Sequence, residues 1–397
     1  MTRTSLVALT LALASPAVAA DEYTFVLVDA FATEYGLREC YLYDIDESNQ
    51  ACGTATITIP WVGGWLTTYT GFYWDPVLEK TPIALNWPNG ISDAGLVAGV
   101  AAVFDIASDT SIPMSTLPGT YFPLVLKGIN DSGIAVGYVQ TCNCSNSAGM
   151  LQIPYVWHPE EGAFTLPVPG ATGASRINGQ GKIVGWIGGN SSPNSYVYDL
   201  ATDTYMIMST VFEGANTKTT ATDISETGVV VGSRMSSNGQ ITHGYTWSPE
   251  TGVTLLPLPP AGFQKYVAPA GINVAGTVVG TIATMQGSQR AFVYDATHGV
   301  RDLNTLTTPA PGFVMNAATA VNDNGWIVGW GSGGGGMTRA FVLKPKIAGD
   351  LDGDGTVGPA DLAILLGAWG TSGAGDLNGS GAVDGEDLGT LLASWSL

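Results

Sequence analysis

The sequence predicts an all-β fold, and three of its properties support this prediction. Glycine and proline are abundant, at 53 and 22 of 397 residues, which favours many turns. Hydrophobic residues make up 45% of the chain and charged residues only 12%, so there is enough apolar material for a core. A short residue pattern also recurs seven times. These properties argue against an all-α fold and indicate short strands joined by turns.

Each copy of the pattern begins with an aliphatic residue and ends with a glycine eight positions later. Within Ile129–Gly137, Asn130 begins a turn and Gly133 supplies the positive φ of a bulged hairpin loop. Six copies have this turn glycine, and the first has Asn49, which also tolerates left-handed backbone. Each copy is therefore predicted to be a β-hairpin. The copies are residues 45–53, 91–99, 129–137, 177–185, 224–232, 272–280 and 321–329.

Two further strands are predicted after each hairpin. The third is aromatic and β-branched, as in residues 196–199, and the fourth follows a turn, as in residues 252–256. The closing glycines of successive hairpins are 38 to 49 residues apart. Four short strands in a unit of this length are typical of one blade of a β-propeller.

The two ends of the repeat region predict how the ring closes. The seventh unit ends at Lys346 after its third strand, whereas residues 22–29 form an extra strand before the first hairpin. This N-terminal strand is predicted to complete the last blade and so to remove an exposed sheet edge. Residues 22–346 are thus predicted to form a seven-bladed propeller. The alternative is a β-solenoid, which stacks in line and needs no such exchange.

The unit resembles the HAF repeat of secreted bacterial proteins. The resemblance rests on the hairpin and on the third strand, which reads Arg-Ala-Phe at 290–292 and 339–341 and His-Gly-Tyr at 243–245. It covers most of the chain after residue 20. The resemblance implies an extracellular repeat protein and no particular reaction.

Residues 1–20 are predicted to be a secretory signal peptide. Arg3 precedes an apolar run from Leu6 to Ala14, and small residues follow up to Ala20. The run is too short to span a bilayer, and no later segment approaches a transmembrane length. We therefore expect a secreted protein, extracellular or at the cell surface. The formal net charge of −19 argues against binding to nucleic acid.

An exported chain with an even number of cysteines favours disulfides over free thiols. Cys40, Cys52, Cys142 and Cys144 allow three pairings. Cys40 with Cys52 is favoured because these residues flank a predicted hairpin. Cys142 and Cys144 lie in a loop, where they would form a strained ring, stay reduced or, less plausibly, bind a metal.

The composition changes after a linker at residues 347–349. Residues 350–397 contain eight acidic residues and no lysine or arginine. Their first twelve residues place carboxylates at positions 1, 3, 5 and 12 and a glycine at position 6, the spacing of an EF-hand calcium loop. The predicted ligands of a first calcium ion are Asp350, Asp352, Asp354, the Thr356 carbonyl and Asp361.

A second loop repeats this plan with fewer charges and is expected to bind a second calcium ion more weakly. Its predicted ligands are Asp376, Asn378, Ser380, the Ala382 carbonyl, Asp384 and Asp387. A helix is predicted after each loop, over residues 361–369 and 387–395. The alternative, an acidic solvated tail, does not explain ligands placed twice at the same spacing. The region is therefore predicted to be a small α-helical domain of two paired EF-hand units.

The paired loops and helices of residues 350–397 resemble a type I dockerin. This resemblance implies a calcium-dependent module that docks onto a cohesin domain in a polysaccharide-degrading assembly. The family recognises cohesin through positions 10 and 11 of each loop, here Pro359-Ala360 and Gly385-Glu386. A purely structural calcium module is the alternative.

No cluster of catalytic residues is evident in the sequence. His158, His243 and His298 belong to three different repeats, and no nucleophile elbow is present. Hairpin carboxylates could meet at the propeller mouth as a glycosidase pair, but turn chemistry also explains them. The carboxylates concerned are Asp93, Asp131, Glu226 and Asp323.

A long insertion in the first blade is a candidate binding surface because it is rich in aromatic residues. Trp61, Trp65 and Tyr69 could stack on sugar rings, whereas Tyr73 and Trp74 are expected in the core. The sequence thus favours a non-enzymatic binding or scaffold propeller, attached by its calcium module to a polysaccharide-related assembly. The alternatives are a glycosidase or lyase propeller and a surface structural protein without a ligand.

Overall fold

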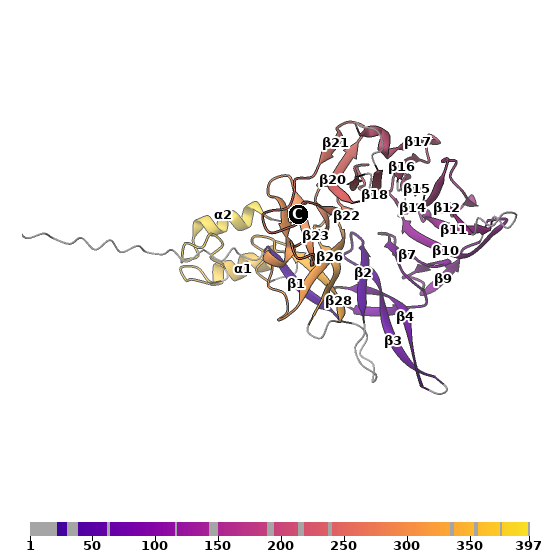
Figure 1. The fold of residues 1–397 in the computed structure, drawn as a ribbon. Helices are drawn as coiled ribbons and strands as arrows, with labels where there is room; N and C mark the ends of the chain where they lie inside the picture. Colours follow the sequence, from indigo (N-terminus) through magenta and orange to yellow (C-terminus); the bar gives the residue numbers. More distant parts are fainter. Residues whose placement is uncertain are drawn as a thin grey trace, which may run out of the picture.

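A computed structural model describes residues 22–29, 39–61, 64–115, 117–142, 150–188, 194–212, 218–236, 240–333, 337–352, 356–373 and 375–395. These residues form seven antiparallel sheets of four strands, followed by two short α-helices. The sheets follow one another around a ring, and the helices lie to one side of it (Figure 1). The predicted signal peptide, residues 1–20, lies outside the described residues.

The first six blades are formed in chain order. Blade 1 contains β2 (Cys40–Ile45), β3 (Ala51–Trp61), β4 (Gly64–Asp75) and β5 (Glu79–Ile83). Blade 2 contains β6 (Gly90–Ile91), β7 (Leu96–Ala98), β8 (Ala102–Asp105) and β9 (Thr110–Pro113). Blade 3 contains β10 (Thr120–Ile129), β11 (Ala135–Cys142), β12 (Met150–His158) and β13 (Gly162–Phe164). Blade 4 contains β14 (Ala171–Ile177), β15 (Lys182–Ile187), β16 (Asn194–Asp199) and β17 (Thr204–Ile207). Blade 5 contains β18 (Lys218–Ile224), β19 (Val230–Met235), β20 (Ile241–Ser248) and β21 (Gly252–Leu255). Blade 6 contains β22 (Ala268–Ile272), β23 (Val278–Ala283), β24 (Gln289–Asp295) and β25 (Gly299–Asp302). Short 3₁₀ turns follow β17 and β25, at Met208–Val211 and Leu303–Thr305.

The seventh blade confirms the predicted closure of the ring. It contains β26 (Val314–Val321), β27 (Ile327–Ser332), β28 (Thr338–Pro345) and, as its outer strand, β1 (Tyr23–Val28). β1 runs antiparallel to β28, with Tyr23 opposite Pro345 and Val28 opposite Ala340. The first strands of neighbouring blades contact one another around the ring, and β26 contacts β2. The fold is therefore a seven-bladed β-propeller.

The turn glycines and the closing glycines of the repeat are required for two different physical reasons. The turn residues have left-handed backbone, with φ of 76° at Gly133 and 63° at Asn49, as predicted. The closing glycines instead lie against the first strand, where a β-carbon on Gly137 would be 2.0 Å from the Val125 carbonyl oxygen. A β-carbon on Gly232 would be 1.9 Å from the Thr220 oxygen. Larger residues at these closing positions would push the two strands apart.

The third strands supply the largest buried side chains of the propeller. Tyr155, Tyr196, Tyr245, Phe72, Phe292 and Phe341 are fully buried. Tyr196 of β16 illustrates their packing, since it contacts a cluster that includes Ile134 and Val136 of the preceding blade. The aromatic pattern of the sequence therefore marks the cores between blades. Burying each such side chain is worth about 2 to 3 kcal/mol.

The favoured disulfide between Cys40 and Cys52 is wrong. Both thiols are buried and free, and they pack in different clusters on opposite sides of blade 1. Cys40 lies opposite Ala55, because a bulge between Leu42 and Asp44 shifts the register of the hairpin. Burial raises the pKa of the Cys40 thiol to about 12. Cys144 and the side chain of Cys142 lie outside the described residues.

The C-terminal region contains α1 (Pro359–Gly367) and α2 (Gly385–Ala393). Their interface is a small core of four fully buried residues, Val357, Leu365, Val383 and Leu391. Each helix begins two residues before its predicted start. Two short helices are thus present as predicted, but they do not by themselves show a paired EF-hand domain. In the part of the chain that the structure describes, no helix is both long and apolar enough to span a membrane.

Candidate functional site

The hairpin turns of the repeats meet at one mouth of the central channel, here called the hairpin mouth. Buried side chains fasten neighbouring turns there. Nδ2 of Asn130 donates to the Asn178 carbonyl, and Nδ2 of Asn178 donates to the Ser225 carbonyl, both at 3.0 Å. Across the ring closure, Nδ2 of Asn322 donates to the Asp46 carbonyl at 2.8 Å. The polar residue after the aliphatic position therefore holds adjacent blades together.

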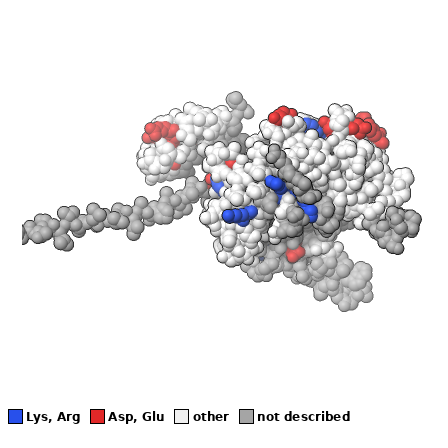
Figure 2. Space-filling view, turned by 45° about the horizontal axis from the view of Figure 1, so that its top comes forward, with Lys and Arg blue, Asp and Glu red and all other residues white. Residues whose placement is uncertain are grey.

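The four carboxylates considered for catalysis do lie together, lining a cavity of about 180 Å³ at the hairpin mouth with Glu47. Each of these five carboxylates accepts a backbone N–H from the equivalent turn of the preceding blade. The bonds are Glu47 N to Asp93 Oδ1 at 2.7 Å, Asp93 N to Asp131 Oδ1 at 2.8 Å, Gly179 N to Glu226 Oε2 at 2.9 Å, Val274 N to Asp323 Oδ1 at 2.8 Å, and Asp323 N to Glu47 Oε1 at 2.8 Å. This carboxylate belt gives the acidic turn residues a structural use. Figure 2 shows acidic side chains gathered along one edge of the propeller and on the C-terminal module.

Two carboxyl groups at the hairpin mouth have strongly perturbed pKa values. Burial raises the pKa of Asp46 and of Glu47 to about 7, and nearby carboxylates add to the effect. A carboxyl that is partly protonated at neutral pH suits a general acid. Both oxygens of Glu47 nevertheless accept the backbone N–H of Asp323, at 2.8 and 2.9 Å.

The guanidinium of Arg176 lies inside the channel, between the two mouths. Arg176 of β14 donates through Nη1 to the Lys127 carbonyl at 2.6 Å, and its Nε is 3.8 Å from the Asp223 carboxylate. Burial alone would lower the pKa of Arg176. The negative charges of Asp44 and Asp223 outweigh this effect, so that the pKa of Arg176 is raised. Arg176 contributes to the cavities at both mouths of the channel. The three charges therefore separate one mouth from the other.

The opposite mouth is formed by bulges in the first strands, and we call it the bulge mouth. In six blades the register of the first strand shifts at one or two places, and a bulge of this kind redirects a side chain. Five of the skipped residues, one from each of five blades, line a cavity of about 350 Å³. Its lining is Tyr43, Asn89, Lys127, Arg176, Thr222, Pro269, Ala270 and Thr319.

Aromatic side chains border the bulge mouth. Tyr43 lines the cavity and stacks parallel to Tyr41, whose ring is 5.8 Å from that of Trp330. The rings of Tyr69 and Trp87 are in contact, with centroids 4.7 Å apart and planes tilted by 41°, and the two residues are 42% and 43% exposed. Trp87 also has a positive φ of 52°, which is unusual for a bulky residue.

The predicted aromatic surface is therefore described in part. Tyr69 is exposed, and Trp87, whose ring contacts it, was not identified from the sequence. Trp61 and Trp65 belong to the paired strands β3 and β4, near the tip of the long hairpin in Figure 1. Their side chains lie outside the described residues. Trp87 lies in the connection between β5 and β6 and is not part of the repeat pattern, so the pattern could not identify it.

A larger cavity, of about 580 Å³, lies between blades 5 and 6 and was also not predicted. Three of its seven lining residues have amide side chains, and Lys265 and Tyr266 also line it. The amides belong to Gln240, Gln264 and Gln289. Because these residues fall in irregular connections and strand ends, the repeat does not mark them.

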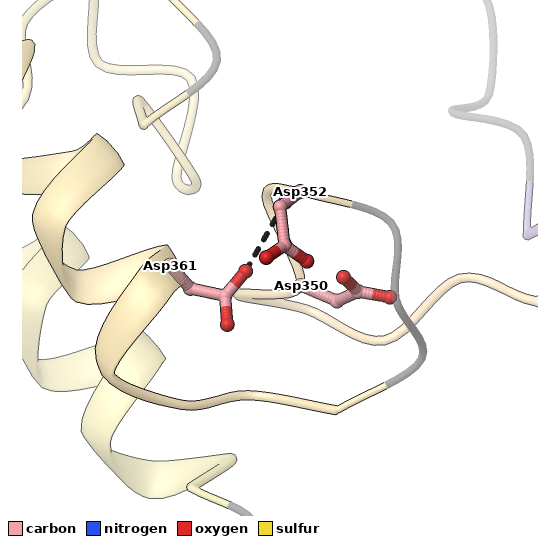
Figure 3. A group of neighbouring side chains, drawn as sticks. All are labelled: Asp350, Asp352 and Asp361. Carbon is pink, nitrogen blue, oxygen red and sulfur yellow. Dashed lines mark hydrogen bonds between the residues drawn. The ribbon is translucent and has the colours of Figure 1, made fainter.

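In the first C-terminal loop, three predicted ligands meet. The carboxylates of Asp350, Asp352 and Asp361 have oxygens within 4.8 Å of one another and face the space between the loop and α1 (Figure 3). Asp361 is 1% exposed and accepts the N–H groups of Leu351 and Gly358, at 2.7 and 2.8 Å. Burial opposes ionisation, but these bonds lower the pKa of Asp361 overall. Asp354 lies outside the described residues.

The second loop repeats the hydrogen bonds of the buried acid, but among the described residues its carboxylates do not meet in a group of three. Asp387 is buried and accepts the N–H groups of Leu377 and Asp384, each at 2.8 Å. Asp376 accepts those of Ser380 and Gly381, at 2.9 and 2.8 Å. Among the donors, carboxylate, amide and carbonyl oxygens predominate, which is the ligand chemistry that Ca²⁺ prefers. The donor types of both loops therefore fit calcium, and in the first loop three of the carboxylates also lie close together.

Comparison with known proteins supports the fold and goes no further. No family model and no curated protein matches the chain. The β-propeller domain of the Trilobed protease from Pyrococcus furiosus is similar, with a TM-score of 0.53 and 13% identity over 78% of this chain and 94% of that one. The acylaminoacyl peptidase from Pyrococcus horikoshii is similar over 77% of this chain, with a TM-score of 0.52 and 11% identity. This chain spans about half of that peptidase, 51% of its length.

Proposed function

We propose that this protein is a secreted, non-enzymatic binding propeller whose C-terminal module binds two calcium ions. The module would attach the propeller to a larger extracellular assembly, as a dockerin attaches to cohesin, and a polysaccharide would be the ligand. The carboxylate belt is the single observation that carries the non-enzymatic part of the proposal. Its carboxylates are committed to backbone N–H groups between blades.

The calcium part of the proposal rests on the two C-terminal loops. Three carboxylates within 4.8 Å repel one another strongly unless a cation lies between them. A bound Ca²⁺ would remove this repulsion and order the loop ahead of α1. The residues proposed to hold the ions are those of the two predicted loops, with Asp361 and Asp387 at the start of the helices.

Calorimetric titration of the full chain with CaCl₂ tests the calcium part. We expect two ions per chain, and the first loop should bind more tightly because it contains more carboxylates. A protein that binds no calcium above background would contradict this part. Adsorption to insoluble polysaccharides, followed as loss of protein from solution, tests the binding part.

A carbohydrate-active enzyme is the second candidate. The raised pKa of Glu47, to about 7, favours it, because a glycosidase needs a protonated carboxyl near neutral pH. Release of soluble sugar that a Glu47→Gln substitution abolishes would establish the enzyme and overturn the proposal.

A further inference from the structure

The bulge mouth differs in charge from the rest of this acidic protein. Its cavity is lined by two cationic side chains, Lys127 and Arg176, and none of the described residues in the lining is acidic. The guanidinium of Arg176 is already engaged by carbonyls and by Asp223. Lys127 is thus the cationic group that remains for a ligand.

The Lys127 ammonium has no acidic partner among the described residues. No ion pair joins it to any of the carboxylates whose positions the structure gives, while its backbone carbonyl accepts a bond from Arg176. Burial, and then the charge of Arg176, lower the pKa of Lys127. A partly buried cation without a counter-ion is unfavourable, and an anionic ligand would relieve this cost.

Two threonine hydroxyls of the cavity can accept hydrogen bonds from a ligand. The Thr222 hydroxyl donates to the Pro269 carbonyl at 3.2 Å, and the Thr319 hydroxyl donates to the Leu42 carbonyl at 2.9 Å. Because each hydroxyl donates its hydrogen to a carbonyl, its oxygen keeps lone pairs that can accept a hydrogen bond from a ligand hydroxyl group. Sugars supply such hydroxyl groups.

The aromatic border adds flat surface beside the cation. Asn89 connects the two features, since it lines the cavity and its Nδ2 donates to the carbonyls of Trp87, at 2.8 Å, and Leu126, at 3.0 Å. The Trp87 ring contacts that of Tyr69 at a tilt of 41°, and both residues are about two-fifths exposed. Exposed aromatic faces beside polar groups are suited to stacking on sugar rings.

We propose that the bulge mouth binds an acidic oligosaccharide, with a uronate carboxylate at Lys127 and a neighbouring sugar ring on the Tyr69–Trp87 pair. This inference rests on the proposed binding function and names its ligand class. A cavity of about 350 Å³ is within the range of small-molecule sites and accommodates one sugar unit, so the rest of the chain would lie across the aromatic border.

Calorimetry on the full chain with two matched ligands tests this inference. The ligands are a trimer of galacturonic acid and the same trimer with its carboxyl groups reduced to alcohols. We expect the acidic trimer to bind at least tenfold more tightly, because a charge-assisted hydrogen bond is lost on reduction. This comparison needs no variant and so does not depend on a variant that folds.

Three substitutions refine the test. Lys127→Met should remove the preference for the acidic trimer, and Tyr69→Ala should weaken both trimers about tenfold. Lys182→Met is the control, because Lys182 begins β15 and does not line the bulge-mouth cavity. It should leave both affinities unchanged. Equal binding of the two trimers by the unmodified protein, or a preference that survives Lys127→Met, would overturn the inference. Inorganic phosphate that binds as tightly as the acidic trimer would also overturn the inference, because such binding would indicate an anion site that does not recognise sugar.

Polysaccharide adsorption separates failure of this inference from failure of the proposed function. If the unmodified protein and the Lys127→Met variant adsorb equally to an acidic polysaccharide, the binding function stands and its site is elsewhere. If the unmodified protein adsorbs to no polysaccharide, the binding function fails as well.

Discussion

Replacing Arg176 by methionine removes the cation that lies against Asp223 and Asp44 in the channel and leaves these two carboxylates behind. Asp223 lies 3.8 Å from the guanidinium, and the charge of Asp44 acts on it as well. The side chains of Arg176 and Asp223 are 21% and 18% exposed, so channel water reaches part of the pair. Breaking a fully buried pair costs about 3 to 5 kcal/mol, and the partial exposure places this site near the lower value. We expect Arg176→Met to lower the free energy of unfolding by about 3 kcal/mol at pH 8.

The loss should be smaller in acid, because protonation removes the unpaired charges. Burial raises the pKa of Asp223 to about 6, and Arg176 is the main group that lowers it. Without Arg176 this pKa rises further above its unfolded value of about 4. A carboxyl with a raised folded-state pKa contributes stability below the unfolded value and loses it as pH rises through the folded value. At pH 5 only the lost hydrogen bonds should remain, at about 1 kcal/mol.

Urea unfolding followed by tryptophan fluorescence at pH 5 and pH 8 measures this difference. Urea is preferable to guanidinium because it does not screen charges. Arg290→Met is the matched control, since Arg290 pairs with Asp302 at the same 3.8 Å but in the outer part of its blade. We expect the control to lose less than about 1 kcal/mol at both pH values. Equal losses for Arg176→Met at pH 5 and pH 8 would refute the reasoning.

Four further predictions follow from contacts elsewhere in the molecule. Burial raises the pKa of Asp46 and Glu47 to about 7, so the unmodified propeller should be more stable at pH 5 than at pH 8 in thermal unfolding. Asn322→Ala should lower the free energy of unfolding by about 3 kcal/mol in urea, because it removes a buried side chain with three hydrogen bonds of 2.8 Å. Removing residues 22–28 should expose the edge of β28 and produce oligomers in light scattering, whereas a monomer of unchanged stability would contradict the closure. Asp361→Ala should abolish the tighter of two calcium sites in calorimetry and spare the weaker one, and the loss of neither site would argue against the first loop as a ligand set.

The repeat predicted the blades because its physics is local. The positive φ of Gly133 and Asn49, the aromatic third strands and the unpaired strand at residues 23–28 are each visible in a few neighbouring residues. Strand exchange was predictable for the same reason, since one end of the chain had a strand too many and the other had one too few.

The bulges were not predictable, and they account for most of what the sequence reasoning missed. A one-residue shift between Leu42 and Asp44 places Cys40 and Cys52 on opposite sides of blade 1, which excludes their disulfide. The same shift in another blade turns Lys127 toward the channel. Nothing in the local sequence distinguishes such a residue from its neighbours, because the bulge depends on pairing with the closing glycine.

The hairpin carboxylates show a different limit. Their gathering at one mouth was predicted from the ring, but their hydrogen bonds to the preceding blade depend on the distance between turns. Asp93 and Asp131 accept N–H groups of turns 46 and 38 residues earlier in the chain, at 2.7 and 2.8 Å. The sequence therefore predicts that these carboxylates lie near one another, but it does not predict which backbone N–H group each of them accepts.

The claim that this propeller binds a glycan without cutting it is tested most directly by following adsorption and sugar release in one sample. The full chain is incubated with CaCl₂ and a panel of insoluble acidic and neutral polysaccharides, and soluble protein and reducing sugar are measured together. We expect protein to leave solution with at least one acidic polysaccharide while no sugar is released. Reducing sugar that accumulates with the unmodified protein and is absent with Glu47→Gln would contradict the claim.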